Sequence, residues 1–344
     1  MPRRVTLADV AQQAGVSRTT ASFVLSGRND MRISKEAQSR VLVAARELSY
    51  RPNLTARGLR TSVTHTVGFL SDSVATTQFA GEMIRGSLEA ATAREHLLFI
   101  AETGGDPEVE ARVVDGMLDR QVDGVVYATM SHRQVKPAAS LAGRRVVLLN
   151  CNAAGFDAPF VVPDERAAGR AVAQAVLDAG HRANVHVIGG HEYTDRTPDG
   201  AIAGHSRMRG IMDAFGDCSL RPASVFQCGW EPEHGYQAVS SLLSRSPRPT
   251  ALICCNDRLA LGAYQALHQA GLVIPDDVSV VSFDDSPLAA WMRPALASAA
   301  LPHYEMGRKA VELVLATTPA SDRPHLVPME FEVRPSLAGP APRP

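Results

Sequence analysis

The sequence has no long hydrophobic run and no apolar leader. None of its apolar stretches reaches the roughly 18 residues that a membrane-spanning helix needs. The opening residues Met1-Pro2-Arg3-Arg4 are not followed by the apolar segment of a secretory signal. We therefore expect a cytoplasmic protein that binds no membrane.

Patterns that hold metals and cofactors are also missing. Five cysteines are scattered without metal-ligand spacing, which predicts reduced and mostly buried thiols. They are Cys151, Cys218, Cys228, Cys254 and Cys255. The 11 histidines are spread along the chain, with no partnered cysteine and no metal triad. We expect no metal site and no cofactor.

Phosphate-binding signatures of enzymes are absent as well. No G-x-G-x-x-G opens a helix after the first expected strand, and no Walker pattern occurs. The stretch Gly104-Gly105-Asp106-Pro107-Glu108 has residues that suit phosphate, but in its position it is an ordinary strand-to-helix loop. Dehydrogenases and kinases are thus disfavoured, and no catalytic residue is predicted.

What the chain does have is a helical pattern near its N-terminus. Thr6 can cap a first helix, and Asp9, three residues on, can return the hydrogen bond. Gly15 permits the positive φ of a helix exit, and Ser17 can cap a second helix. Two helices around one tight turn form a helix-turn-helix, whose second helix enters the DNA major groove. The alternative is an ordinary helical hairpin.

The distribution of charge favours the DNA-binding interpretation. Residues 1–60 contain 11 Lys and Arg against 4 Asp and Glu, a net charge of +7. The remaining residues carry a net charge of −8, and the whole chain is close to neutral. A basic segment of this size suits a polyanion, because phosphate contacts supply most of the non-specific affinity for DNA.

A third helix and a linker follow. Ser34 can cap a helix from Lys35 to about Ser49, which completes a head of residues 1–49. In the linker, residues 50–62, Asn53 can start a short helix. Gly58 costs that helix about 1 kcal/mol relative to alanine, so it is marginal alone. The segment is either a solvated linker or one that orders only on DNA.

From His65 onward, apolar strands alternate with helical stretches. Strands are predicted at 66–70, 96–101, 124–127, 145–149, 185–189, 224–228, 251–255 and 279–283. Helices are predicted at 79–94, 107–120, 133–142, 165–179, 206–215, 232–245, 257–270 and 287–293. This α/β alternation predicts two doubly wound parallel-sheet lobes, with a cleft where the carboxyl ends of their strands meet. Residues 338–344 are expected to be disordered.

Several short strings, in this order, carry a resemblance to a known family. They are Val5-Thr6-Leu7-Ala8-Asp9-Val10-Ala11 with Ala14-Gly15-Val16-Ser17, Tyr50-Arg51-Pro52-Asn53, Cys255-Asn256-Asp257-Arg258-Leu259-Ala260-Leu261-Gly262, the stretch from Ile274-Pro275-Asp276-Asp277 to Phe283-Asp284-Asp285, and Leu301-Pro302. Over about residues 5–337 the chain resembles the LacI/GalR family of bacterial transcriptional regulators.

The resemblance implies a core of the periplasmic-binding-protein type over residues 63–337. Its N-lobe would comprise about 63–162 and 296–325, and its C-lobe about 163–292 and 326–337. It also implies a homodimer that binds a palindromic operator. The protein would then be an effector-responsive regulator, a repressor of a carbohydrate uptake or catabolism gene cluster. A sugar-transport receptor is disfavoured by the missing signal and the basic head.

Expected DNA contacts carry over from the family's pattern. Arg18 and Thr19 lie where the family reads base edges, and Ser17, Thr20 and Asn29 suit phosphate contacts. Phe23 can pack on a thymine methyl or on the core of the head. Leu59 would enter the minor groove as a wedge. The expected set is Thr6, Ser17, Arg18, Thr19, Thr20, Ser22, Asn29, Asn53, Ala56 and Leu59.

Expected effector contacts lie at strand ends. Arg207 can bind hydroxyls or a carboxylate with its fork, Asp284 can accept two hydroxyl bonds, and Trp230 offers a flat face to a sugar ring. The expected set is Asp72, Gln78, Phe79, Tyr127, Asn150, Arg207, Trp230, Asn256 and Asp284. Each has an ordinary alternative, such as a helix cap, a core residue or a turn. A sugar is the expected effector and a nucleoside the alternative, with either induction or corepression.

Overall fold

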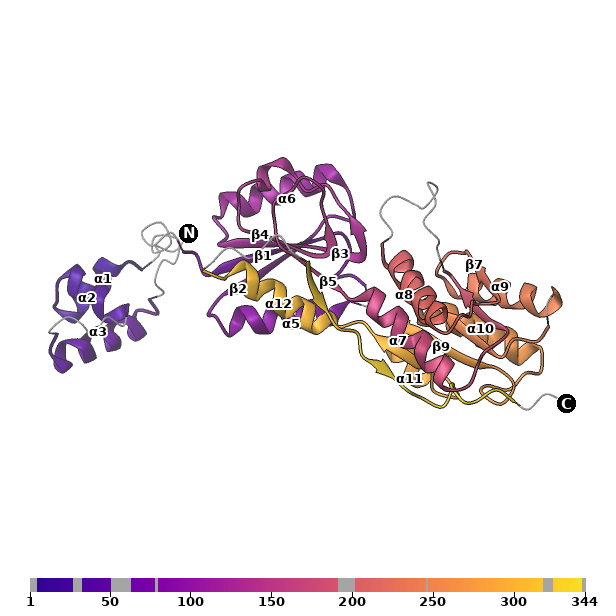
Figure 1. Ribbon diagram of the computed structural model, residues 1–344. Coiled ribbons are helices and arrows are strands. Elements are labelled where there is room, and N and C mark those ends of the chain that lie inside the picture. The colour runs from indigo at the N-terminus through magenta and orange to yellow at the C-terminus, as the bar shows by residue number, and fades with distance from the viewer. Residues whose placement is uncertain are drawn as a thin grey trace. The chain divides into compact units, whose positions relative to one another are not determined.

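The computed structural model describes residues 5–26, 33–50, 63–77, 80–190, 202–245, 247–317 and 324–341 (Figure 1). It divides into two units, residues 1–64 and 65–344. The expected contacts Asn29, Asn53, Ala56, Leu59, Gln78 and Phe79 lie outside the described residues. In the described ranges, no helix is both long and apolar enough to cross a membrane.

The first unit has the predicted helix-turn-helix. Its helices are α1 (Leu7–Ala14), α2 (Arg18–Leu25) and α3 (Lys35–Glu47). Thr6 and Asp9 form the capping box, in which the Thr6 backbone N–H donates to Asp9 Oδ2 at 2.7 Å. Gly15 ends α1 with φ +63°, and the Ser17 hydroxyl accepts the Thr20 N–H at 3.0 Å. Small side chains fill the interior, which lets the helices approach closely: Val10, Ala11, Ala14, Ala21, Val41 and Ala44 are buried.

The N-lobe of the second unit is a six-stranded parallel sheet in the order β11-β5-β4-β3-β1-β2. Its strands are β1 (Thr66–Ser71), β2 (Leu97–Glu102), β3 (Gly124–Gln134), β4 (Val146–Asn152), β5 (Phe160–Pro163) and β11 (Pro324–Val327). Its helices are α5 (Gly81–Thr92), α6 (Pro107–Asp119), η1 (Ala139–Leu141) and α12 (His303–Val314). The inner strands are apolar on both faces because α5 and α12 cover one face of the sheet and α6 the other.

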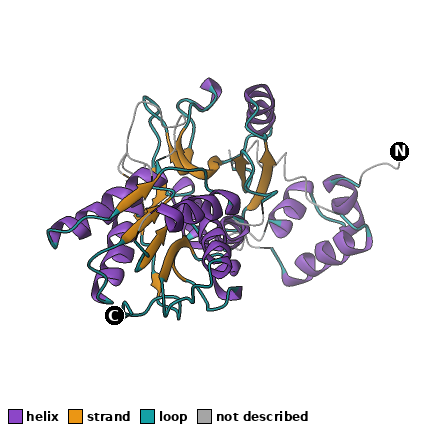
Figure 2. Cartoon of the chain, turned by 90° about the vertical axis from the view of Figure 1, so that its right-hand side faces the viewer, coloured by secondary structure: helices purple, strands orange, loops and turns teal. Residues whose placement is uncertain are grey.

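The C-lobe is a second six-stranded sheet in the order β12-β10-β9-β8-β6-β7. Its strands are β6 (Val185–Ile188), β7 (Ser224–Phe226), β8 (Ala251–Cys254), β9 (Ser279–Asp284), β10 (Ala297–Ala300) and the antiparallel β12 (Phe331–Glu332). Its helices are α7 (Glu165–Asp178), α8 (Ala203–Asp217), α9 (Pro232–Arg245), α10 (Asp257–Gln269) and α11 (Pro287–Trp291). Figure 2 shows helices flanking the strands. The predicted fold, a helical head and two parallel-sheet lobes, is confirmed.

Two predicted lobe assignments differ from the structure. Residues 297–300, assigned to the N-lobe, form β10 and pair with β9 in the C-lobe sheet. Residues 326–327, assigned to the C-lobe, belong to β11 in the N-lobe sheet. The chain therefore changes lobe near Leu301 and again between Val327 and Phe331, because β10 pairs with β9 and β11 pairs with β5.

The helix predicted at 133–142 is also wrong, and so is the disorder expected at residues 338–341, whereas residues 342–344 lie outside the described residues. Residues 133 and 134 continue β3 and pair with Cys151 and Asn152, and only Ala139–Leu141 is helical, as a short 3-10 turn. Strand pairing thus prevails over the helical pattern. The tail is anchored at Ala338, whose N–H donates to Ser279 Oγ at 3.1 Å and whose carbonyl lies 2.8 Å from His181 Nε2.

Two glycines let α7 and α8 cross in contact. A Cβ at Gly169 would lie 2.1 Å from the Arg207 carbonyl oxygen, and one at Gly210 would lie 2.0 Å from the Arg166 carbonyl oxygen. A methyl group cannot fit against a backbone carbonyl at that distance. The crossing therefore fixes Arg207 of α8 next to the start of α7.

We predict that Gly210→Ala destabilises the protein by about 1–3 kcal/mol, because overpacking forces the two helices apart. Gly216→Ala, on the same helix, is the control: its Cβ would meet nothing within 4 Å. That control is expected to be neutral or slightly stabilising, since alanine favours helix over glycine. Urea unfolding of both variants measures the difference, and equal effects would contradict the close crossing.

Candidate functional site

The start of α2 presents the expected DNA-reading side chains. Arg18 and Thr19 are exposed there, directly after the Ser17 cap. The Ser17 and Thr20 hydroxyls lie 2.8 Å apart, so both also stabilise the start of the helix. Ser22 and Phe23 are half-buried, and Thr6 is exposed within its capping box. The exposed edge of α2 therefore begins with one cation and one hydroxyl.

In the C-lobe, a buried arginine binds two carboxylate side chains and one backbone carbonyl from three other segments of the chain. Arg207 of α8 is 1% exposed. Its Nε lies 2.5 Å and its Nη2 3.1 Å from the two carboxylate oxygens of Glu165, at the start of α7. Its Nη1 donates to the Cys255 carbonyl and lies 3.2 Å from Asp284 Oδ1, at the end of β9. A buried charge is tolerated only when paired and hydrogen-bonded, and this one is held by two carboxylates.

Aromatic rings sit beside the Arg207 guanidinium. Its Cζ is 5.3 Å from the centroid of the Trp230 ring and 4.8 Å from that of Phe283, which are distances of cation–π contact. The Trp230 indole N–H donates to the Gly189 carbonyl at 2.9 Å. The ring is thus fixed in place and remains half-buried.

Asp284 is the part of this cluster that reaches solvent. Its side chain is 25% exposed, and its backbone is in the left-handed region with φ 100°. Burial raises the pKa of Asp284 to about 7, although the positive charge of Arg207 opposes the shift. A carboxyl group of this kind can accept hydroxyl hydrogen bonds and can exchange a proton near neutral pH.

Asn256 is a helix cap. It is fully buried, its Oδ1 accepts the Leu259 N–H at 2.8 Å, and its Nδ2 donates to the Trp230 carbonyl at 3.1 Å. The alternative that the sequence left open for this residue, capping of α10, is what the structure shows. Asn256 supports the position of Trp230 through the backbone.

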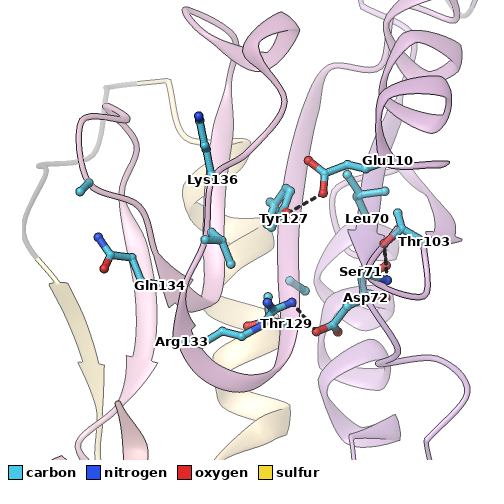
Figure 3. A pocket seen from close by; sticks show the side chains of 14 residues that line it. Leu70, Ser71, Asp72, Thr103, Glu110, Tyr127, Thr129, Arg133, Gln134 and Lys136 are labelled. Carbon is cyan, nitrogen blue, oxygen red and sulfur yellow. Dashed lines mark hydrogen bonds and ion pairs between the residues drawn. The ribbon is translucent and has the colours of Figure 1, made fainter. Parts of the chain in front are cut away.

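In the N-lobe, a cavity of about 560 Å³ opens at the strand ends, and Asp72, Tyr127 and Thr129 line it (Figure 3). The Tyr127 hydroxyl points toward Glu110 and donates to its Oε2 at 2.8 Å, and burial raises the pKa of Tyr127. Arg133 Nη2 lies 2.9 Å from Asp72 Oδ2. Asn150 is buried, with its Nδ2 directed at the carbonyls of Thr129 and Met130.

Sequence reasoning missed several members of these clusters. Glu165, Glu110 and Arg133 all hold a predicted residue in place. Glu165 could have been suspected, since it opens a helix directly after the strand ending at Pro163. The described residues contain no group of three His, Cys, Asp or Glu side chains that could hold a metal. Cys151, Cys254 and Cys255 are buried, and burial raises the pKa of each thiol.

Known proteins share both parts of the chain. Residues 6–53 match the family described as "Bacterial regulatory proteins, lacI family", and residues 173–337 match a "Periplasmic binding protein-like domain". The ribose operon repressor of Haemophilus influenzae is 31% identical over 315 residues, 90% of this chain and 91% of that protein. The repressor PurR of Histophilus somni is 28% identical over 336 residues, 96% of this chain and 97% of that protein.

Solved structures agree in fold. The lac repressor dimer bound to operator and the anti-inducer ONPF matches with a TM-score of 0.79 at 22% identity, over 98% of this chain and 100% of that chain. A helix-turn-helix head on a core of two parallel-sheet lobes is the architecture of a DNA-binding transcriptional regulator, and the relatives that match over most of this chain are repressors. The chain belongs to the lacI family, as its sequence motifs indicate. Operator DNA, a second copy of the chain and a small-molecule effector, the partners predicted from the sequence, are the partners of repressors in this family.

We predict that Arg18→Ala weakens operator binding by about 1–3 kcal/mol and relaxes the preference at one base pair, because arginine reads guanine through two hydrogen bonds. Fluorescence anisotropy with operators substituted at each position tests this. Arg46→Ala removes an equal charge from an exposed position on α3, and it should leave the sequence preference unchanged. A uniform loss over all operators for Arg18→Ala would argue for a phosphate contact instead.

The raised pKa of Asp284 predicts a pH dependence of folding stability. Between the ordinary pKa near 4 and the folded value of about 7, the folded state holds a proton that the unfolded state releases. The contribution of Asp284 to the free energy of unfolding is therefore present at low pH and is lost as the pH rises through 7. Relative to Asp284→Asn, the native protein should lose stability between pH 5 and pH 8 in urea unfolding. Parallel profiles for the two proteins would refute the raised pKa.

Proposed function

We propose that the protein senses a small sugar with the Arg207, Asp284 and Trp230 cluster and controls genes for carbohydrate uptake or catabolism. It would act in the cytoplasm as a dimer on a palindromic operator. The single observation that carries the proposal is the partly exposed Asp284 carboxylate, held against a buried arginine whose guanidinium lies 5.3 Å from the centroid of the Trp230 ring. This combination suits a sugar, because a carboxylate accepts hydrogen bonds from sugar hydroxyls and an aromatic ring packs on the apolar face of the sugar.

The relatives support a sugar. Ribose operon repressors are among the proteins most similar to this chain, at 29–31% identity. D-ribose is accordingly the first sugar to test. A nucleoside stays the alternative, because the half-buried Trp230 ring can also stack on a base.

Ligand binding would act on DNA through the lobes. An effector that binds one relative orientation of the lobes better than another shifts the population toward it. The same coupling changes operator affinity, and it is reciprocal between the two sites. Either sign, induction or corepression, fits this scheme.

We predict that a sugar recognised by this cluster raises the melting temperature of the full chain, and that Asp284→Asn abolishes the shift. A free ligand concentration of about 100 times the dissociation constant stabilises the folded protein by about 2.7 kcal/mol. The panel is D-ribose, D-xylose, D-galactose and adenosine. Asp285→Asn, the same substitution one residue on, is the matched control, since Asp285 pairs with Arg334 instead. A shift that survives Asp284→Asn would place the ligand elsewhere.

Arg207→Ala is not a suitable test. Removing the guanidinium would leave Glu165 buried without its cation, and breaking a buried pair costs about 3–5 kcal/mol. Loss of ligand binding in that variant would therefore report loss of folding. Asp284→Asn preserves shape and leaves the Glu165 pair with Arg207 intact.

A further inference from the structure

The turn between α1 and α2 sets the direction of the recognition helix. Helix α1 ends at Ala14, Gly15 turns the chain with φ +63°, and α2 begins at Arg18. The Val16 N–H donates to the Ala11 carbonyl at 3.0 Å, which closes the turn. A helix end leaves its last four carbonyl groups without a partner inside the helix, so the Ala14 carbonyl needs a donor from elsewhere.

Arg40 of α3 supplies this donor. Its Nε donates to the Ala14 carbonyl at 3.1 Å, although 26 residues separate the two in the sequence. Its Nη1 lies 3.6 Å from Glu36 Oε1, one turn earlier on α3. A cation at this end of α1 is also favoured by the partial negative charge of the terminal carbonyls. Arg40 therefore caps α1 from another helix and ties α3 to the turn.

Arg40 thus has a role besides the charge that a DNA-binding head needs. Residues 1–60 carry a net charge of +7, which suits phosphate. An arginine that only contributes to this charge needs no partner within the head, whereas the Nε of Arg40 hydrogen-bonds to α1. The Arg40 side chain is 51% exposed, so its charge can also reach solvent. The hydrogen bond and the charge are therefore two properties that an experiment can separate.

We propose that Arg40 is a positioning residue for operator recognition, which fixes the turn at Gly15 and thereby the direction in which α2 presents Arg18 and Thr19. The inference rests on DNA binding by the head and does not depend on the proposed sugar sensing. Reading a base edge through two hydrogen bonds requires close placement of the side chain. Phosphate contacts carry no sequence information, and they supply most of the non-specific affinity. Loss of the Arg40 hydrogen bond should therefore reduce specific binding much more than non-specific binding.

Three substitutions separate the hydrogen bond of Arg40 from its charge. In Arg40→Gln, the amide nitrogen occupies the same place along the side chain as the arginine Nε. An N–H can then still reach the Ala14 carbonyl while the charge is lost. Arg40→Ala removes both groups. Arg40→Met also removes both but keeps the length of the stem, so it replaces Arg40→Ala if alanine unfolds the head.

The test measures the DNA affinity of the full chain by fluorescence anisotropy. The probes are a duplex that the wild type selects from random DNA and a scrambled duplex of the same base composition. Arg40→Ala should weaken binding to the selected duplex by at least about fivefold, since one hydrogen bond is lost in each of the two heads of a dimer. Binding to the scrambled duplex should be nearly unchanged. Arg40→Gln should bind the selected duplex almost like the wild type.

Salt dependence and a matched charge control complete the test. Between about 50 and 200 mM KCl, the slope of log affinity against log salt concentration should be the same for the wild type, Arg40→Gln and Arg40→Ala. Each lost phosphate contact would instead reduce the magnitude of that slope by about 0.9. Arg46→Ala removes an equal charge from the last turn of α3, and it should keep the ratio of specific to non-specific affinity unchanged.

Two results would overturn the proposal. Equal losses of affinity for Arg40→Gln and Arg40→Ala would exclude a role for the hydrogen bond, and a reduced salt slope in both would make Arg40 a phosphate contact instead. An unchanged ratio of specific to non-specific affinity in Arg40→Ala and Arg40→Met would show that the turn holds its direction without Arg40.

Discussion

The core depends on one buried positive charge. Arg207 is almost fully inaccessible to solvent, and its guanidinium is held by Glu165, Asp284 and the Cys255 carbonyl. Removing a charge from water costs several kcal/mol unless partners replace the lost hydration. The glycine crossing of α7 and α8, the end of β9 and the end of β8 must therefore all be in place together. The proposed sensing site therefore shares its residues with the packing of the C-lobe.

Because of this constraint, the polar residues at the candidate site have different roles. Most residues that the sequence predicted as ligand contacts hold other parts of the protein in place. Asn256 caps α10, Asn150 and Asp72 hydrogen-bond the backbone of Met130 at the end of β3, and Arg207 binds Glu165. The groups that the proposed sensing function leaves to meet a ligand are fewer, namely the partly exposed Asp284 carboxylate and the half-buried Trp230 ring. A small set of rigidly supported contacts gives better geometric control than a large set of mobile ones.

Much of the fold was predictable from local signals. Caps at Thr6, Ser17 and Ser34 marked the head helices, and apolar runs marked the strands, because burial between two helical layers requires apolar residues on both strand faces. The missed parts depend on distant partners. The register shift in β3 between Ala128 and Arg133 is fixed by pairing with β4, and the short strand β11 joins β5, which lies far back along the chain. Glu165 escaped notice because its partner lies 42 residues away.

The late return of the chain to the N-lobe has a consequence for biosynthesis. The N-lobe sheet and its helical cover include α12 and β11, which follow most of the C-lobe, from α7 to β10, in the sequence. A nascent chain cannot close the N-lobe until those residues leave the ribosome, so apolar surface that α12 covers stays unprotected through most of synthesis. Premature termination near residue 300 would therefore leave two incomplete domains rather than one finished domain, and such a product is a substrate for chaperones and proteases.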